Sequence, residues 1–325
     1  MKILIVLTGG TICTKAISRE KITIRSISND AGLLLIDNYR KTGDTATEFV
    51  VSDNFGILSE NMSIDKYNRI LDFLRSINLS DFDGVIIAHG TDTLGFSAAL
   101  FSVLLSKTPV PVFFVSSNEP VEYKTANGNL NFKAAVDCIK YGIPAGIYVT
   151  YRNISDNKMY LHNAKTLRQA DENANFYSSQ MQCIDDICID NAQNYFTKLN
   201  LSQNTDFDFL KSDKNLCDCV LIINPYPGLD YSRINTDGIS AILHTSYHSG
   251  TVCTDGEDKN SILYLAKNFK GMIYILQNEQ SDEIYSSLLE IANIDNIKFI
   301  CGTVEEAYAA LLTKYSFEDK NDNIK

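Results

Sequence analysis

Basic residues are scarce in this chain of 325 residues. It carries 29 lysines and arginines against 40 aspartates and glutamates, a formal net charge of -11 at pH 7. A protein that binds nucleic acid or an anionic membrane surface needs a basic face to engage phosphate groups. The charge balance therefore argues against both kinds of partner and leaves small-molecule ligands open.

Long apolar runs are also lacking. No segment reaches the roughly 18 consecutive apolar residues that a membrane-spanning helix needs. The first apolar run, Ile3–Leu7, ends at Thr8, which is too short for the core of a secretion signal, and no small-residue cleavage site follows. We therefore expect a soluble, cytoplasmic protein.

Metal-site patterns are missing as well. Among the eight cysteines, Cys217 and Cys219 are separated by one residue, whereas zinc knuckles and redox pairs space their thiols by two. The four histidines form no H-E-x-x-H motif. We therefore expect no metal and no cofactor, and we interpret the cysteines as small buried hydrophobes.

The sequence does contain a regular alternation of apolar runs with helical patterns, typical of a parallel sheet with crossover helices. The length favours two domains. We predict an α/β fold with a larger N-terminal parallel-sheet domain, residues 1–185, and a smaller C-terminal α/β domain, residues 218–315. Residues 186–217, where the pattern loosens, are expected to form a linker, and residues 316–325 a frayed tail.

The individual elements follow from the same patterns. The predicted strands are Lys2–Leu7, Asp83–His89, Val110–Val115, Ile147–Tyr151, Val220–Ile223, Gly238–His244, Gly271–Leu276 and Ile297–Cys301. The predicted helices are Leu94–Leu105, Asn129–Tyr141, Lys259–Lys267, Asp282–Ala292 and Val304–Tyr315. A hairpin is expected over Asn153–Asn163, with its turn at Asp156-Asn157.

Two predicted strands end in glycine turns that carry hydroxyl groups. The first runs into Thr8-Gly9-Gly10-Thr11 and the second into His89-Gly90-Thr91-Asp92-Thr93. Ligands bind at the carboxyl ends of parallel strands, and glycine lets the backbone approach them closely. We expect Asp92 or Thr93 to cap the helix that begins near Leu94. A tight turn alone explains Gly9-Gly10, but the second turn favours a functional site.

A threonine hydroxyl is a poor nucleophile until a neighbouring group takes its proton. The chain has no G-x-S-x-G motif, so a serine-hydrolase interpretation has little support. The first turn is not G-x-G-x-x-G and no basic residue lies close to it, which makes a nucleotide site a weak alternative.

The two turns resemble the signature blocks of the bacterial-type L-asparaginase/glutaminase family. The resemblance covers about residues 1–315 and implies a two-domain α/β fold with a flavodoxin-like N-terminal domain. Weaker similarity to the family extends over Ser59–Met62, Phe113–Pro120, Asn129–Val136, Tyr226–Gly228 and Gly302-Thr303.

The resemblance implies a catalytic set. Thr11 matches the nucleophile that attacks a side-chain amide, giving an acyl-enzyme and ammonia. Thr91 matches a second threonine, which forms a triad with Asp92 and a lysine. Lys165 fits that lysine from its Ala-Lys-Thr context, whereas counting back from Phe176 lands nearer Arg168. Chemistry favours the lysine, because an arginine cannot be deprotonated in a protein.

The resemblance also implies substrate contacts. Asp92 matches the carboxylate that pairs with the substrate α-ammonium, and Ser59 matches the group that binds the α-carboxylate. Glu60 lies where the family often has glutamine, and the carbonyl of Ser117 would accept from the substrate amide. Backbone amides at Thr11 and Thr91 would form an oxyanion hole, and each such donor is typically worth about 3–4 kcal/mol.

One departure concerns a tyrosine that the family often carries on a mobile loop after the first threonine. Residues 12–38 contain no tyrosine; Ser18, Arg19 and Thr23 are the polar candidates on this predicted loop. Three interpretations stay open: another residue assists Thr11, Thr11 relies on the second triad, or the enzyme is less active or differently specific. In the second domain, His248 lies where the family completes a neighbouring subunit's site. It could touch substrate or cap a turn, and we favour the second interpretation.

The resulting hypothesis is a cytoplasmic homotetrameric or homodimeric L-asparaginase that acts on a small amino-acid amide. A mixed asparaginase-glutaminase and a non-catalytic amino-acid sensor remain alternatives. So does the amidase component of a tRNA-dependent amidotransferase. That component normally carries an extra N-terminal domain, which we do not expect here because the first strand already begins at Lys2.

Overall fold

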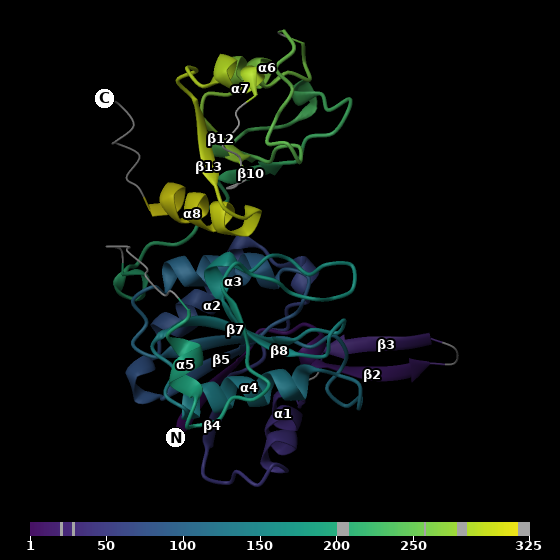
Figure 1. Cartoon of the computed structure of the whole chain (residues 1–325), viewed down its shortest axis with the longest axis vertical. Coiled ribbons are helices and arrows are strands. Elements are labelled where there is room, and N and C mark those ends of the chain that lie inside the picture. The colour runs from purple at the N-terminus through teal and green to yellow at the C-terminus, as the bar shows by residue number, and fades with distance from the viewer. Residues whose placement is uncertain (20–21, 28–29, 200–207, 257, 278–284, 318–325) are drawn as a thin grey trace. The chain divides into compact units, whose positions relative to one another are not determined.

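The computed structural model describes residues 1–19, 22–27, 30–199, 208–256, 258–277 and 285–317. The chain divides into two compact units, Met1–Asp213 and Lys214–Lys325, each built on its own sheet (Figure 1).

Unit 1 contains a seven-stranded sheet in the order β4-β1-β5-β6-β7-β8-β9. Its strands are β1 (Lys2–Leu7), β4 (Glu48–Val51), β5 (Gly84–Ala88), β6 (Pro111–Val115), β7 (Gly146–Arg152), β8 (Met159–Asn163) and β9 (Met181–Cys183). The first five in this order run parallel, while β8 and β9 pair antiparallel. Leu7 of β1 pairs with Ala88 of β5, so the turns that follow these two strands start side by side.

Helices cover both faces of this sheet, which explains why its central strands are apolar throughout. They are α1 (Ala31–Arg40), α2 (Ile64–Arg75), α3 (Leu94–Leu104), α4 (Gly128–Lys140) and α5 (Ala192–Phe196). One core cluster joins α1, α4 and α5 to alternate residues of the strands, such as Ile86 and Phe113. On the other face, Phe101 of α3 packs edge-on against Phe114 at 5.2 Å between ring centroids.

Unit 2 contains a parallel sheet in the order β10-β11-β12-β13. Its strands are β10 (Val220–Ile223), β11 (Ala241–His244), β12 (Met272–Gln277) and β13 (Ile297–Cys301), and its helices are α6 (Ile262–Asn268), α7 (Ser286–Ile291) and α8 (Val304–Phe317). The predicted α/β fold class is therefore confirmed, with a large mainly parallel sheet and a second, smaller parallel one.

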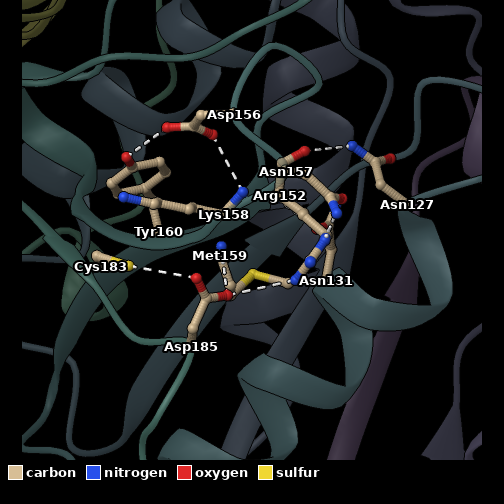
Figure 2. A network of polar contacts seen from close by, with 10 residues as sticks. All are labelled: Asn127, Asn131, Arg152, Asp156, Asn157, Lys158, Met159, Tyr160, Cys183 and Asp185. Carbon is tan, nitrogen blue, oxygen red and sulfur yellow. Dashed lines mark hydrogen bonds and ion pairs between the residues drawn. The ribbon is translucent and has the colours of Figure 1, made fainter.

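The predicted hairpin is formed by β7 and β8, and a polar network holds it (Figure 2). Arg152 Nε donates to Asn157 Oδ1 at 2.8 Å, and its guanidinium pairs with Asp185 at 3.3 Å. Asn131 Oδ1, on α4, accepts from the Arg152 amide at 2.7 Å, and Nδ2 of Asn127, the residue before α4, donates to the Arg152 carbonyl at 2.8 Å. The network fixes the path of β8, whose last residue lies two positions before Lys165.

Several segments differ from expectation. The stretch after Thr11 is not a loop but an antiparallel pair, β2 (Thr14–Arg19) and β3 (Ile22–Ile27), followed by α1. Part of the expected linker folds as α5, whose Ala192 and Phe196 are buried in the core of unit 1. At the other end, α8 runs through Phe317, and residues 318–325 lie outside the described part of the chain.

The interpretation of the cysteines is wrong for half of them. Cys13, Cys138 and Cys219 are buried, but Cys183, Cys188, Cys217 and Cys301 are exposed. Cys183 and Cys301 lie in the edge strands β9 and β13, and Cys188 and Cys217 lie outside the helices and strands. Separately, no helix in the described ranges combines the length and the apolarity needed to span a membrane.

Candidate active site

The two glycine turns meet backbone to backbone in unit 1. The Thr8 hydroxyl and the Thr8 amide both donate to the Ala88 carbonyl, at 2.8 and 3.1 Å. Gly10 has a φ of +72°, and a Cβ placed on it would lie 2.2 Å from the Gly90 Cα. Only glycine permits this approach, because any side chain at this position would overlap main-chain atoms.

The segment that contains Ile57 and Ser59 packs against the same two turns. The Gly10 amide donates to the Ile57 carbonyl at 3.0 Å, and a Cβ on Gly9 would lie 2.0 Å from that oxygen. A Cβ on Gly90 would lie 2.3 Å from Ser59 Oγ. The structure therefore brings the two turns and the Ser59 segment together, although 48 residues separate Thr11 from Ser59 in the chain.

Ser59 and Asp92 are joined directly. Ser59 lies in a 3-10 turn, η2 (Ser59–Asn61), and its hydroxyl donates to Asp92 Oδ2 at 2.9 Å. The Thr93 hydroxyl donates to the Ser59 carbonyl at 3.0 Å. Thr93 does occupy the N-cap position of α3, but its side chain makes no capping bond. The expected side-chain cap is therefore wrong, because the Thr93 hydroxyl binds the Ser59 turn and not the amides of the helix.

Thr11 and Thr91 both present accessible hydroxyl groups. Thr11 opens a 3-10 turn, η1 (Thr11–Cys13), and each of the two threonines is half-buried. Within the described part of the chain, no residue hydrogen-bonds to either hydroxyl. Asp92, between Thr91 and α3, is exposed. The two hydroxyls and the carboxylate are thus available to a small molecule that enters where the turns meet.

Lys165 belongs to a further 3-10 turn, η4 (Ala164–Thr166), directly after β8. The Asn163 side chain caps this turn by accepting from the Lys165 amide at 3.0 Å. The turn packs against α3, the helix that begins two residues after Asp92. Lys165 is half-buried, whereas Arg168 is exposed.

The other predicted contacts lie nearby in the fold. Ser117 follows β6 and is buried; its hydroxyl donates to the Glu119 carbonyl and accepts from the Gly128 amide at 3.2 Å. Glu60 is exposed in η2 beside Ser59. These hydrogen bonds of Ser117 are local to the turn between β6 and α4, so they do not join it to Thr91 directly.

The candidates proposed to replace the missing tyrosine lie on the β2–β3 pair. Ser18 is the cross-strand partner of Thr23, and Arg19 pairs with Ile22. The side chains of these residues lie outside what the structure describes. In unit 2, the loop that carries His248 is closed by a hydrogen bond from the Tyr247 amide to the Thr251 carbonyl at 2.9 Å.

Sequence reasoning assigned no role to His89, although it lies in the second signature block. Its Nδ1 lies 2.7 Å from the Gly90 carbonyl, and its Nε2 lies 2.9 Å from the Ser97 hydroxyl, which in turn contacts the Tyr67 hydroxyl at 2.9 Å. Burial lowers the pKa of His89 to about 4, so the ring is neutral at pH 7. Because a carbonyl only accepts, Nδ1 carries the proton and holds the Gly90 peptide in place.

Buried histidines predict a dependence of stability on pH. Burial lowers the pKa of His89 and His244 to about 4 and that of His162 to about 3, from an ordinary value of 6.5. Between these values the unfolded chain binds protons that the native chain does not. We therefore expect the free energy of unfolding to fall as pH drops from 6.5 towards 4. Calorimetry across this range should show the fall, and His89→Gln should reduce its slope; an unchanged slope would contradict this origin.

A second side chain that sequence reasoning missed is Gln169. Its Nε2 donates to the Asp92 carbonyl, and its Oε1 accepts from the Gly95 amide at 2.8 Å. No local sequence signal predicts this contact, because 77 residues separate Gln169 from Asp92.

This chain is similar to known proteins in sequence over about half of its length and in fold over nearly all of it. The family model described as "Asparaginase, N-terminal" matches residues 2–199. The glutamyl-tRNA(Gln) amidotransferase D subunit of Methanosarcina acetivorans is 30% identical over 168 residues, which are 52% of this chain and 38% of that protein. The corresponding protein of Halobacterium salinarum is 27% identical over 167 residues, 51% of this chain and 38% of that protein. The aligned region therefore spans well under half the length of these relatives.

Solved structures match along nearly the whole chain. The L-asparaginase from Thermococcus kodakarensis superposes with a TM-score of 0.70 at 18% identity, covering 98% of this chain and 94% of that one. L-asparaginase I from Vibrio cholerae gives a TM-score of 0.68 at 18% identity, covering 98% and 93%. The family match covers more than half of the sequence and includes both glycine turns, so the chain belongs to the asparaginase family of amidohydrolases.

Proposed function

We propose that the protein hydrolyses L-asparagine to L-aspartate and ammonia, with Thr11 as the nucleophile. The observation that carries this proposal is the meeting of the two glycine turns with Ser59 and Asp92. A threonine hydroxyl, the backbone amides of the two turns and a carboxylate in this part of the fold are the groups that attack on an amide of a small amino acid requires.

The reaction has two steps. The Thr11 oxygen attacks the carboxamide carbon, and its proton passes through the Thr91 hydroxyl and Lys165 to the departing nitrogen, which leaves as ammonia. Backbone amides of the two turns stabilise the negative oxygen of the intermediate. Water then attacks the ester carbon, breaks its bond to the Thr11 oxygen and restores the hydroxyl while aspartate leaves. No metal or cofactor is required in this scheme.

Lys165 is the preferred proton acceptor. It is half-buried in a turn packed on α3. A lysine side chain can serve as a proton acceptor in catalysis, whereas an arginine keeps its proton in a protein. Arg168, three residues further on, is exposed and its backbone amide donates to the Tyr177 carbonyl at 3.0 Å. These placements support the assignment to Lys165.

Asp92 is proposed to bind the α-ammonium of the substrate. We expect Asp92→Asn to raise KM for asparagine at least tenfold, because a charge-assisted contact is replaced by a neutral one. Steady-state kinetics would measure this, with Asp53→Asn, an exposed aspartate before the Ser59 segment, as the matched control. An unchanged KM would remove Asp92 from this role.

Asparagine is preferred over glutamine in this proposal, with a mixed asparaginase-glutaminase as the alternative. The two amides differ by one methylene group, and a pocket discriminates against such a difference by only about 1–3 kcal/mol of activation free energy. The length of the pocket therefore decides the preference. Ammonia release from each amide, measured with purified protein, gives the ratio directly. Asparagine binding without ammonia release would instead favour an amino-acid sensor.

The relatives in sequence support a second candidate. Both are D subunits of a glutamyl-tRNA(Gln) amidotransferase, so this chain could supply ammonia within such an enzyme. Release of ammonia from free amide by the chain alone favours the asparaginase, whereas release only in the presence of a partner protein and tRNA favours the amidotransferase. In line with the asparaginase proposal, we propose a cytoplasmic homotetramer or homodimer without nucleic-acid or membrane partners.

A further inference from the structure

The side-chain amide of Gln169 is engaged at both ends. Its Oε1 accepts from the Gly95 amide at 2.8 Å and its Nε2 donates to the Asp92 carbonyl. Gly95 is the second residue of α3, and Asp92 lies just before the helix. One side chain from the segment after β8 therefore holds both the start of α3 and the residue that presents the carboxylate.

The first contact replaces a missing helix cap. The first amides of a helix have no partner within the helix, and an N-cap side chain normally accepts from the second or third of them. Thr93 does not do this, because its hydroxyl donates to the Ser59 carbonyl. The Gln169 side chain accepts from the Gly95 amide in its place. The two residues are in close contact, since a Cβ on Gly95 would lie 2.7 Å from Gln169 Oε1 and 3.0 Å from the Gln169 amide nitrogen.

The second contact fixes the orientation of Asp92. Ser59 Oγ holds the Asp92 carboxylate at 2.9 Å, and Gln169 holds its carbonyl, so side chain and peptide plane are restrained from different segments. Gln169 lies four residues after Lys165. The Arg168 amide bonds to the Tyr177 carbonyl at 3.0 Å, which anchors the backbone just before Gln169.

We propose that Gln169 is a positioning residue. It keeps the Asp92 carboxylate directed at the α-ammonium of the substrate and holds Asp92 at a fixed position relative to the Lys165 turn. This inference rests on the proposed function, since it assigns Asp92 to that ammonium group. It predicts that Gln169 governs the binding of substrates that carry the ammonium and leaves ligands without it unaffected.

Gln169→Glu tests the proposal because it keeps the length of the side chain and the acceptor for Gly95. It removes the donor to the Asp92 carbonyl, and a carboxylate at a helix N-terminus is favourable. We expect KM for asparagine to rise at least tenfold while the melting temperature stays within about 2 °C of wild type. The inhibition constant of succinamate, which is asparagine without its α-ammonium, should change less than twofold.

Gln182→Glu on β9 provides the matched control, with the same change in a half-buried glutamine elsewhere in unit 1. It should leave both constants unchanged. A normal KM for asparagine in Gln169→Glu would overturn the proposal, as would an equal loss for asparagine and succinamate, which would indicate a general structural role.

Failure of the proposed function can be told apart from failure of this inference. Wild-type protein that releases no ammonia from either amide would overturn the proposed function alone. Amide hydrogen exchange then tests the two hydrogen bonds of the Gln169 side chain. Gln169→Met lacks both the donor and the acceptor, and it should speed exchange at least tenfold over residues 92–96 relative to wild type and Gln182→Glu. Unchanged exchange there would overturn the inference whatever the substrate.

Discussion

Replacement of Thr11 by valine is expected to lower kcat for amide hydrolysis by at least about 10³-fold while the protein stays folded. The two side chains have nearly the same shape, and valine lacks the oxygen that would attack the carbonyl. Thr11 is half-buried, and no described residue hydrogen-bonds to its hydroxyl, so little native stabilisation is lost. We expect the free energy of unfolding to change by less than about 1 kcal/mol.

Two further variants make the result specific. Thr11→Ser keeps a hydroxyl and should retain measurable turnover, whereas Thr45→Val makes the same chemical change at an exposed threonine of unit 1 and should behave as wild type. Ammonia release under saturating asparagine measures all three. Folded Thr11→Val with kcat within tenfold of wild type would show that another group is the nucleophile.

The meeting of the two glycine turns was predictable because it follows from the sheet. Apolar runs identify β1 and β5, and parallel neighbours deliver the residues after them to the same edge. The register that pairs Leu7 with Ala88 then sets Thr8 and His89 at matching positions. The resemblance to the asparaginase family, which rests on these same residues, is confirmed by the family match.

What the sequence did not reveal depends on contacts between distant segments. The diversion of the Thr93 hydroxyl to Ser59, and the reach of Gln169 to Asp92, arise only once three loops have packed together. By contrast, β3 has a partial local signal, since Ile22 and Ile24 alternate with the polar residues Thr23 and Arg25. We nevertheless expected a loop after Thr11, because the resemblance to the family implies one.

Replacement of Gly10 by alanine is expected to disrupt the contact between the two turns. Gly10 has a φ of 72° and a ψ of -174°, a conformation that costs other residues about 1–3 kcal/mol. The added Cβ would also lie 2.2 Å from the Gly90 Cα and 2.4 Å from the Gly90 nitrogen. Main-chain atoms cannot rotate away, so the two turns must separate.

Gly56→Ala is the control for an added methyl group at a positive φ without the steric overlap. Gly56 has a φ of +71°, nearly that of Gly10, yet nothing lies within 4 Å of the position its Cβ would occupy. We expect Gly10→Ala to lower the free energy of unfolding by about 2 kcal/mol more than Gly56→Ala does, measured by denaturant titration. Because Thr11 follows Gly10 directly, kcat/KM should also fall at least about 100-fold, since displacement of a reacting group by about 1 Å has an effect of this size. If the two variants matched in stability and activity, the close approach of the turns would not be what holds the nucleophile in place.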